Sequence, residues 1–171
     1  MARMSTKENK TEYQLRREEL GLSREKASEL LETITPERIE RIESRKTVAY
    51  PDEIVLMADK YQCPHLCNIY CSKECAIGKK IVPEIKIKDL SQIVLSMLAS
   101  LNSIKKRQER LIEITVDGRI EADEIEDFIS IQKDLERMSI AVGALQLWAE
   151  QKISSGEIDI DAYKATIEKI D

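Results

Sequence analysis

Hydrophobic residues in the first part of the chain recur at intervals of three and four, the period of short amphipathic helices. The segment 12–19 is one candidate, and Gly21 is placed to end it. Ser23 can cap a second helix over 24–32, with Ala27, Leu30 and Leu31 on its apolar face. The pattern therefore predicts two short helices joined by a tight turn.

Prolines mark the starts of the next three predicted helices. Thr35 followed by Pro36 supplies a capping hydroxyl and a proline in the first turn, so a third helix begins there. Ile39 and Ile42 lie on its inner side. Pro51 opens a fourth helix, and Pro64 opens a fifth that reaches Cys75. Together these segments predict a bundle of five short helices.

The pattern changes after residue 78. In residues 79–88, charges flank the apolar residues and Pro83 excludes a continuous helix, so this segment is predicted to be a linker. Two long apolar rows follow, separated by an Asp117-Gly118 turn; they are Leu90, Val94, Met97, Leu101, Ile104, Leu111, and Phe128, Ile131, Leu135, Met138, Val142, Leu145. Steps of four and three predict an αα-hairpin with a coiled-coil seam.

Composition agrees with an all-α protein. Charged residues make up 35% of the 171 residues and aromatic residues only 4%, which is typical of long, solvated helices and argues against a β-sandwich or barrel. No apolar run approaches the roughly 20 residues that span a bilayer. The first residues also lack the apolar stretch of a signal peptide. We therefore expect a cytoplasmic protein without a membrane partner.

Charge is distributed unevenly along the chain. Residues 1–80 carry 15 basic and 14 acidic side chains, whereas residues 81–171 carry 12 and 18. Because phosphate binding is driven by clustered cations, a nucleic acid is expected to bind the first half.

Residues 22–43 carry a motif. Leu22-Ser23 opens it, the small pair Ala27-Ser28 lies inside the second helix, Ile34-Thr35 enters the third helix, and Ile39 with Ile42-Glu43 closes it. This stretch resembles the Cro/XRE-type helix-turn-helix of phage-repressor-like transcriptional regulators. The wider resemblance to this family covers about residues 11–75. The resemblance implies a repressor-like bundle whose third helix enters the major groove of DNA.

If the third helix reads DNA, its position in the motif indicates which side chains make contact. Residues at its start are expected to face base edges: Thr35, Glu37 and Arg38, with Arg41 one turn further on. Arg24, Arg45 and Lys46 are expected to lie near phosphates. Each of these basic residues can equally be a solvated surface charge.

All four cysteines and the single histidine lie within thirteen residues: Cys63, His65, Cys67, Cys71 and Cys75. On one continuous helix the outer two cysteines lie about 18 Å apart, too far to share one metal ion. A site would need a bend at Pro64 or a second chain. We expect buried thiols that act as small apolar residues along one face, and no cofactor; a zinc or iron–sulfur site and thiol redox sensing are the alternatives.

The sequence therefore predicts three parts: a helix-turn-helix DNA-binding domain (1–78), a linker (79–88) and a helical dimerisation domain (89–171). The expected function is a non-enzymatic, sequence-specific transcriptional regulator that binds double-stranded DNA as a homodimer. The alternative is a helical scaffold or protein-interaction module that keeps the fold without binding DNA. The expected dimer interface consists of Val94, Met97, Leu101, Phe128, Leu135, Met138, Val142 and Leu145.

Overall fold

The computed structural model describes residues 10–170, which form helices and contain no strand. The protein is therefore all-α over this range, as the hydrophobic pattern predicts. The expectation that no signal peptide begins the chain concerns residues that lie outside the described ones. None of the helices between residues 10 and 170 has both the length and the apolar character that a bilayer crossing requires.

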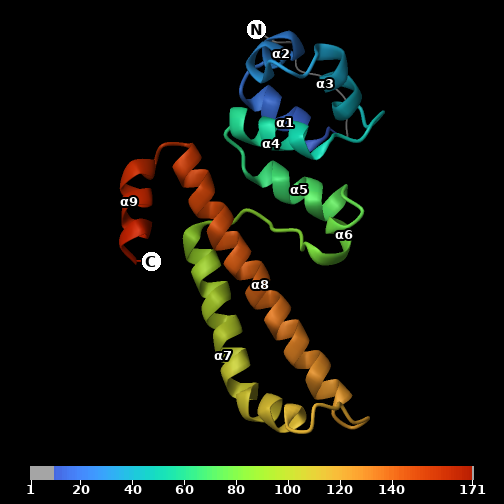
Figure 1. Cartoon of the computed structure of the whole chain (residues 1–171), viewed down its shortest axis with the longest axis vertical. Coiled ribbons are helices and arrows are strands. Elements are labelled where there is room, and N and C mark those ends of the chain that lie inside the picture. Colours follow the sequence, from blue (N-terminus) through green and yellow to red (C-terminus); the bar gives the residue numbers. More distant parts are fainter. Residues whose placement is uncertain (1–9, 171) are drawn as a thin grey trace. The chain divides into compact units, whose positions relative to one another are not determined.

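Figure 1 shows the helices of the described range, and their starts lie close to the predicted ones. The first six are α1 (Glu12–Glu19), α2 (Arg24–Leu31), α3 (Pro36–Glu43), α4 (Pro51–Lys60), α5 (His65–Lys73) and α6 (Gly78–Ile81). The last three are α7 (Leu90–Thr115), α8 (Ile125–Ser154) and α9 (Ile160–Ile170).

Local capping explains why the short helices begin where they do. The hydroxyl of Ser23 accepts a hydrogen bond from the amide of Lys26, and that of Thr35 accepts one from the amide of Arg38. At the start of α4, the Glu53 carboxylate accepts a hydrogen bond from the amide of Tyr50, and Pro51 occupies the first turn. Because these capping residues act within one turn, the helix starts can be predicted from the sequence.

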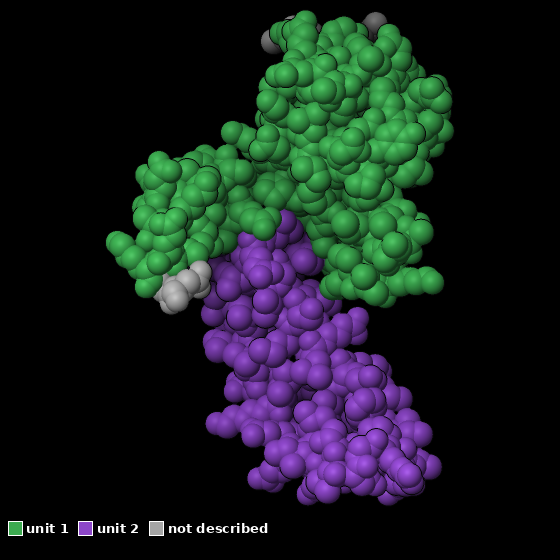
Figure 2. Space-filling view, viewed as in Figure 1, with its two compact units in different colours: residues 1–84, 149–171 green, residues 85–148 purple. Residues whose placement is uncertain are grey.

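The chain divides into two compact units, coloured separately in Figure 2: residues 1–84 with 149–171, and residues 85–148. The core of the first unit lies among α1 to α5, where α2 packs on α3 and α4, and α4 packs on α5. Its largest fully buried side chains are Leu31, Ile39, Ile54, Met57, Tyr61 and Leu66. The sequence predicts a linker at residues 79–88 and a single helical domain over residues 89–171. The structure groups residues 149–171 with the first unit.

The second unit consists mainly of α7 and the larger part of α8. The hydroxyl of Ser103 donates a hydrogen bond to the carboxylate of Asp134 at 2.6 Å, and Nε of Arg110 donates one to Asp127 at 2.7 Å. These two pairs show that the helices run antiparallel, with position 101 at the level of position 136. Buried side chains recur along the two facing rows: Ile93, Ser100, Ile114, Ile131, Asp134, Ala141 and Ala144.

The predicted linker contains one helical turn, α6, followed by extended chain up to Asp89. Gly78 begins this turn directly against α5, because a Cβ atom at Gly78 would lie 2.1 Å from the carbonyl oxygen of Cys71. The amide of Gly78 also donates a hydrogen bond to the sulfur of Cys75. Only a glycine permits this close approach, so the chain stays attached to α5 after the fifth helix ends.

Candidate nucleic-acid interface

The inner side of α3 is held by apolar contacts and by one buried charge. Ile39 and Ile42 are buried against Ala27 and Leu31 of α2, within the core of the first unit. Glu43, the last residue of α3, is 3% exposed. The opposite side of α3 is exposed at Glu37, Glu40 and Arg41. The helix is therefore fixed along one side and free along the other.

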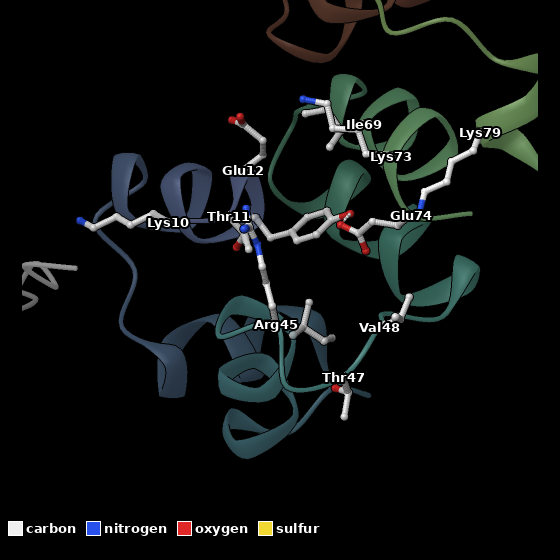
Figure 3. Close-up of a pocket in the computed structure, with 12 residues that line it drawn as sticks. Lys10, Thr11, Glu12, Arg45, Thr47, Val48, Ile69, Lys73, Glu74 and Lys79 are labelled. Atoms are coloured by element: carbon white, nitrogen blue, oxygen red, sulfur yellow. Dashed lines mark hydrogen bonds between the residues drawn. The ribbon is translucent and has the colours of Figure 1, made fainter. Parts of the chain in front are cut away.

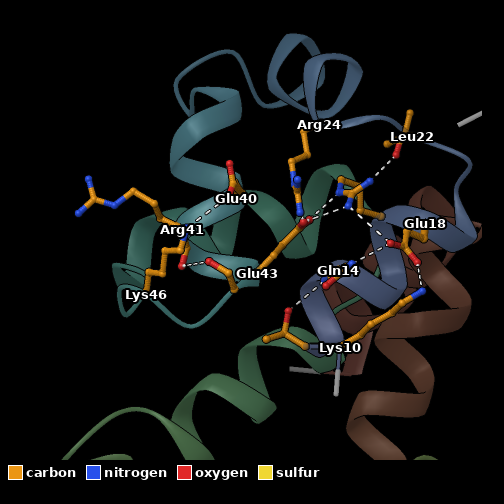
Figure 4. Close-up of polar contacts among 12 residues, drawn as sticks. Lys10, Gln14, Glu18, Leu22, Arg24, Glu40, Arg41, Glu43 and Lys46 are labelled. Carbon is orange, nitrogen blue, oxygen red and sulfur yellow. Dashed lines mark hydrogen bonds and ion pairs between the residues drawn. The ribbon is translucent and has the colours of Figure 1, made fainter. Parts of the chain in front are cut away.

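Glu43 binds two arginines at once (Figure 4). Its two carboxylate oxygens accept hydrogen bonds from Arg17 at 2.5 Å and 3.0 Å, and Nε of Arg24 donates a third at 3.0 Å. Arg17 also donates to the carbonyl oxygen of Leu22 at 2.6 Å. Such a network ties α1, α2 and α3 together, and each buried charge has a partner. Arg24, expected near a phosphate, therefore has its Nε engaged inside the chain, although its side chain is 35% exposed.

Arg38, which was expected to face base edges, is bound within its own chain. Its Nε and Nη2 donate hydrogen bonds to the two carboxylate oxygens of Glu53, at 2.7 Å and 2.6 Å. Nη1 donates to the hydroxyl of Thr47 and Nη2 also to the carbonyl of Val48. The guanidinium carbon lies 4.8 Å from the centre of the Tyr50 ring. These contacts direct Arg38 towards the start of α4 instead of outward from α3.

The remaining predicted DNA contacts of α3 are exposed. Thr35 lies at the helix start, where its hydroxyl is already engaged as the cap, and Glu37 follows it. The side chain of Arg41 extends away from the polar cluster in Figure 4, and its guanidinium group has no hydrogen bond or ion pair to any residue between 10 and 170. Lys46 forms a loose ion pair with Glu40 at 3.4 Å, and both side chains are largely exposed. Arg41, in the last turn of α3, and Lys46, just after the helix, are therefore exposed cations.

Acidic side chains are frequent on the exposed sides of α2 and α3. Glu25 and Glu29 are exposed on α2, and Glu37 and Glu40 on α3, beside the cations Lys26 and Arg41. A carboxylate can accept a hydrogen bond from cytosine N4, but it repels every phosphate. These exposed carboxylates therefore make the surface poorly suited to non-specific attraction of a phosphate backbone.

Arg45, the third expected phosphate contact, lies in the wall of a groove of about 370 Å³ (Figure 3). Its backbone has a φ of 57°. Ile42 and Ile69 contribute apolar surface to this groove, while Lys10, Lys73 and Lys79 contribute further cations. Inside it the hydroxyl of the buried Tyr13 donates a hydrogen bond to the carboxylate of Glu74 at 3.0 Å, and burial together with that carboxylate raises the pKa of Tyr13. No pattern in the sequence predicts this groove, because its walls come from segments about sixty residues apart.

All four cysteines are free thiols and half-buried. Cys63 and Cys67 pack against the core of the first unit, and burial raises the pKa of both thiols. His65, the first residue of α5, is also half-buried. Within residues 10–170, no group of three or more His, Cys, Asp or Glu side chains is arranged to hold a metal ion. The cysteine row therefore adds polarisable surface to the edge of the core.

The eight residues expected at a dimer interface fall into two groups in the second unit. Met97, Phe128, Met138 and Leu145 are half-buried in the rows where α7 and α8 face each other. Val94, Leu101, Leu135 and Val142 are 37% to 46% exposed. The predicted row thus combines residues of two adjacent stripes, one between the helices of a single chain and one at its surface. Three exposed apolar residues of the second stripe are absent from the prediction: Leu98, Ile112 and Ile125.

Comparison of the chain with protein-family models, with curated proteins and with solved structures found no match in any of the three.

Proposed function

We propose that this protein is a sequence-specific, DNA-binding transcriptional regulator that acts as a homodimer. One observation carries the proposal: α3 is anchored by Ile39, Ile42 and Glu43, while its opposite side is exposed and bears Glu37 and Arg41. A helix of this kind, preceded by a second helix and a short turn, is the element that helix-turn-helix proteins insert into the major groove.

In the proposed fold, helices α1 to α5 correspond to the bundle of Cro/XRE-type repressors, with α2 and α3 as the helix-turn-helix. Helices α7 and α8 correspond to a hairpin with coiled-coil character that joins two chains. Two recognition helices held in this way read half-sites about one helical turn of DNA apart.

The contacts within the chain assign different roles to the basic residues. The guanidinium group of Arg41 has no partner among the described residues, so Arg41 is the proposed base-reading cation, with Glu37 as an acceptor for cytosine. Lys46 is the proposed phosphate contact, because its ion pair with Glu40 is long and exposed. Arg38 and Arg24 are positioning residues, since their guanidinium groups bind Glu53 and Glu43.

The experiment is a selection of bound fragments from a random DNA library, followed by titrations of the enriched sequence at several salt concentrations. Arg41→Ala is expected to lower specific affinity by about 1–3 kcal/mol and to relax the preference at one base pair. Lys46→Ala is expected to weaken all sequences alike and to reduce the salt dependence. Lys133→Ala, which removes an exposed cation of α8, is the matched control and is expected to change neither. Selection without enrichment would refute the proposal.

A second function is favoured by the exposed carboxylates of α2 and α3. Glu25, Glu29, Glu37 and Glu40 suit a basic protein surface better than a phosphate backbone. In this alternative the chain is a helical scaffold that keeps the repressor-like bundle and binds another protein. A lack of DNA enrichment, together with salt-sensitive binding of a lysine-rich peptide that Glu37→Gln weakens, would favour it.

A further inference from the structure

The unit formed by residues 85–148 has a second apolar surface besides the one between its helices. The buried rows include Ile93 and Ser100 on α7, and Asp134 and Ala141 on α8. The residue after each of these is Val94, Leu101, Leu135 or Val142, and all four are exposed. Moving one residue along a helix turns the side chain by about 100°. A surface stripe therefore runs beside each buried row.

The two surface stripes lie on the same flank of the helix pair. Because α7 and α8 run antiparallel, a step of one residue rotates clockwise on one helix and anticlockwise on the other, seen from one end. Both steps therefore lead to the same side. We call this side the apolar flank, and its members are Val94, Leu98, Leu101 and Ile112 of α7 with Ile125, Leu135 and Val142 of α8. The opposite flank is polar, with Ser96, Ser103, Lys106, Ser130, Lys133 and Arg137.

We propose that the apolar flank is covered by the same flank of a second copy of this chain, about a twofold axis parallel to the helices. This inference rests on the homodimer of the proposed function and specifies its surface and its orientation. Each α7 then lies antiparallel against α8 of the partner subunit, which completes a four-helix bundle.

The levels of the residues support this axis. Hydrogen bonds between Ser103 and Asp134 and between Arg110 and Asp127 set the level of each position on α7 relative to α8. A parallel twofold axis brings equal levels together. Val94 then meets Val142 of the partner subunit, Leu101 meets Leu135 of the partner subunit, and Ile112 meets Ile125 of the partner subunit.

A polar layer divides the flank and also matches itself. Lys105 and Gln108 of α7 and Gln132 of α8 are exposed between the two apolar groups, and Lys105 is at the level of Gln132. A polar interruption of an apolar row fixes register in coiled coils. An axis perpendicular to the helices would set α7 against α7 and bring Lys105 near Leu101 of the partner subunit. The parallel axis is therefore the one that sets apolar residues against apolar residues and polar residues against polar residues of the partner subunit.

The size of the flank is sufficient for a stable dimer. From Leu90 to Ile112 it is about 33 Å long at 1.5 Å per residue, and two helices at about 10 Å each make it about 20 Å wide. Each chain would cover about 650 Å², or about 1,300 Å² in total, which is within the range of specific interfaces.

The first experiment measures molar mass by light scattering at tens of micromolar, with helical content followed by circular dichroism. We expect a dimer for the wild-type chain and a monomer of unchanged helicity for Leu101→Glu, because the carboxylate would be buried without a partner. Leu95→Glu is the matched control: Leu95 is on the same helix and 66% exposed, but it points away from both stripes. It is expected to remain dimeric. A monomeric wild-type chain, or equal effects of both variants, would overturn the proposal.

The second experiment tests the orientation and does not depend on a single variant folding well. Leu101→Glu and Leu135→Lys are each expected to be monomeric alone. Mixed one to one, with one chain labelled with nitrogen-15, they are expected to form a heterodimer by native mass spectrometry, because each glutamate faces a lysine. A dimeric wild-type chain whose variants do not pair in this way would overturn the orientation. Neither readout uses DNA, so a failure of DNA binding is recognised separately.

Discussion

Arg38 of α3 and Glu53 of α4 form a two-pronged ion pair, with Nε–Oε1 and Nη2–Oε2 distances of 2.7 Å and 2.6 Å. Each is the third residue of its helix, and the pair joins the starts of the two helices. The side chains of Arg38 and Glu53 are 22% and 13% exposed. Glu53 also caps α4 through the amide of Tyr50, so this contact links a cap to the neighbouring helix.

Arg38→Ala is expected to destabilise the first unit by about 1–2 kcal/mol, because Glu53 loses two charge-assisted hydrogen bonds in a partly solvated site. Arg38→Lys is expected to recover only part of this loss, since lysine cannot make the two-pronged contact. The measurement is the midpoint of urea unfolding. A variant as stable as the wild type would show that the pair contributes nothing, and would reopen a DNA role for Arg38.

Stability is expected to fall as the pH drops below about 4.5. Burial opposes ionisation of Glu53, but the hydrogen bonds from Arg38 and from the Tyr50 amide outweigh it and hold the pKa below its ordinary value of 4.5. Burial likewise opposes ionisation of Glu18, and hydrogen bonds from Lys10 and Gln14 lower its pKa. A carboxyl group whose pKa is lower in the folded state stabilises the fold at pH values above its unfolded pKa. This stabilisation is lost as the pH falls through the folded pKa.

Glu53→Gln is expected to be less stable at pH 7 and to show a shallower decrease of the unfolding free energy on acidification. Urea titrations at pH 7 and at several values down to about 3 measure both effects. Identical pH profiles for Glu53→Gln and the wild type would contradict the assignment.

Glu32→Gly is expected to stabilise the protein by about 0.5–1 kcal/mol. Glu32 ends α2 with a φ of 60° and a ψ of −45°, a backbone conformation that glycine adopts more easily than glutamate. Glu29→Gly, an exposed substitution inside the same helix, is the control and is expected to cost about 1 kcal/mol. Thermal unfolding of both variants shows whether the signs differ. Equal destabilisation would mean that Glu32 is not strained.

Cys63 and Cys67 are expected to react with iodoacetamide more slowly than Cys71 and Cys75. Burial raises the pKa of the first two thiols, and both pack against the core, so their thiolate is scarce at neutral pH. Mass spectrometry of peptides after timed alkylation gives the four rates, and urea-unfolded protein is the control in which they converge. Faster reaction at Cys63 or Cys67 would indicate a redox-active site.

Protein purified without oxygen is expected to contain no stoichiometric zinc or iron and to show no visible absorption. The sulfurs of α5 are strung along a helix of nine residues and its flanks, and a single ion cannot reach all of them at metal–sulfur distances near 2.3 Å. Elemental analysis tests this. Stoichiometric metal that is lost in Cys67→Ser would overturn it.

The helices could be predicted closely because their signals are local: Ser23, Thr35-Pro36 and Pro51 each act within one turn. The partner of Arg38 could not, because Glu53 is 15 residues away and periodicity does not say which side chains of two helices meet. The apolar rows of α7 and α8 could not be separated for a related reason. Steps of three and four fit two adjacent stripes equally, so the pattern places half-buried Met97 and exposed Leu101 in one row.

Asp134 is 2% exposed between α7 and α8, and its carboxylate is held by Ser103, Arg107 and Arg137. Sliding α8 by one heptad towards the start of α7 would leave this charge among Ile93, Ser96 and Met97, far from Arg107. The carboxylate therefore contributes more to a single alignment of α7 and α8 than to the free energy of unfolding. A leucine in its place would leave Arg107 and Arg137, whose side chains are 42% and 69% exposed, in contact with solvent, so the helix pair would lose little stability. The substitution would also remove the energetic cost of shifted alignments of α7 and α8, so the same two helices would populate several alignments.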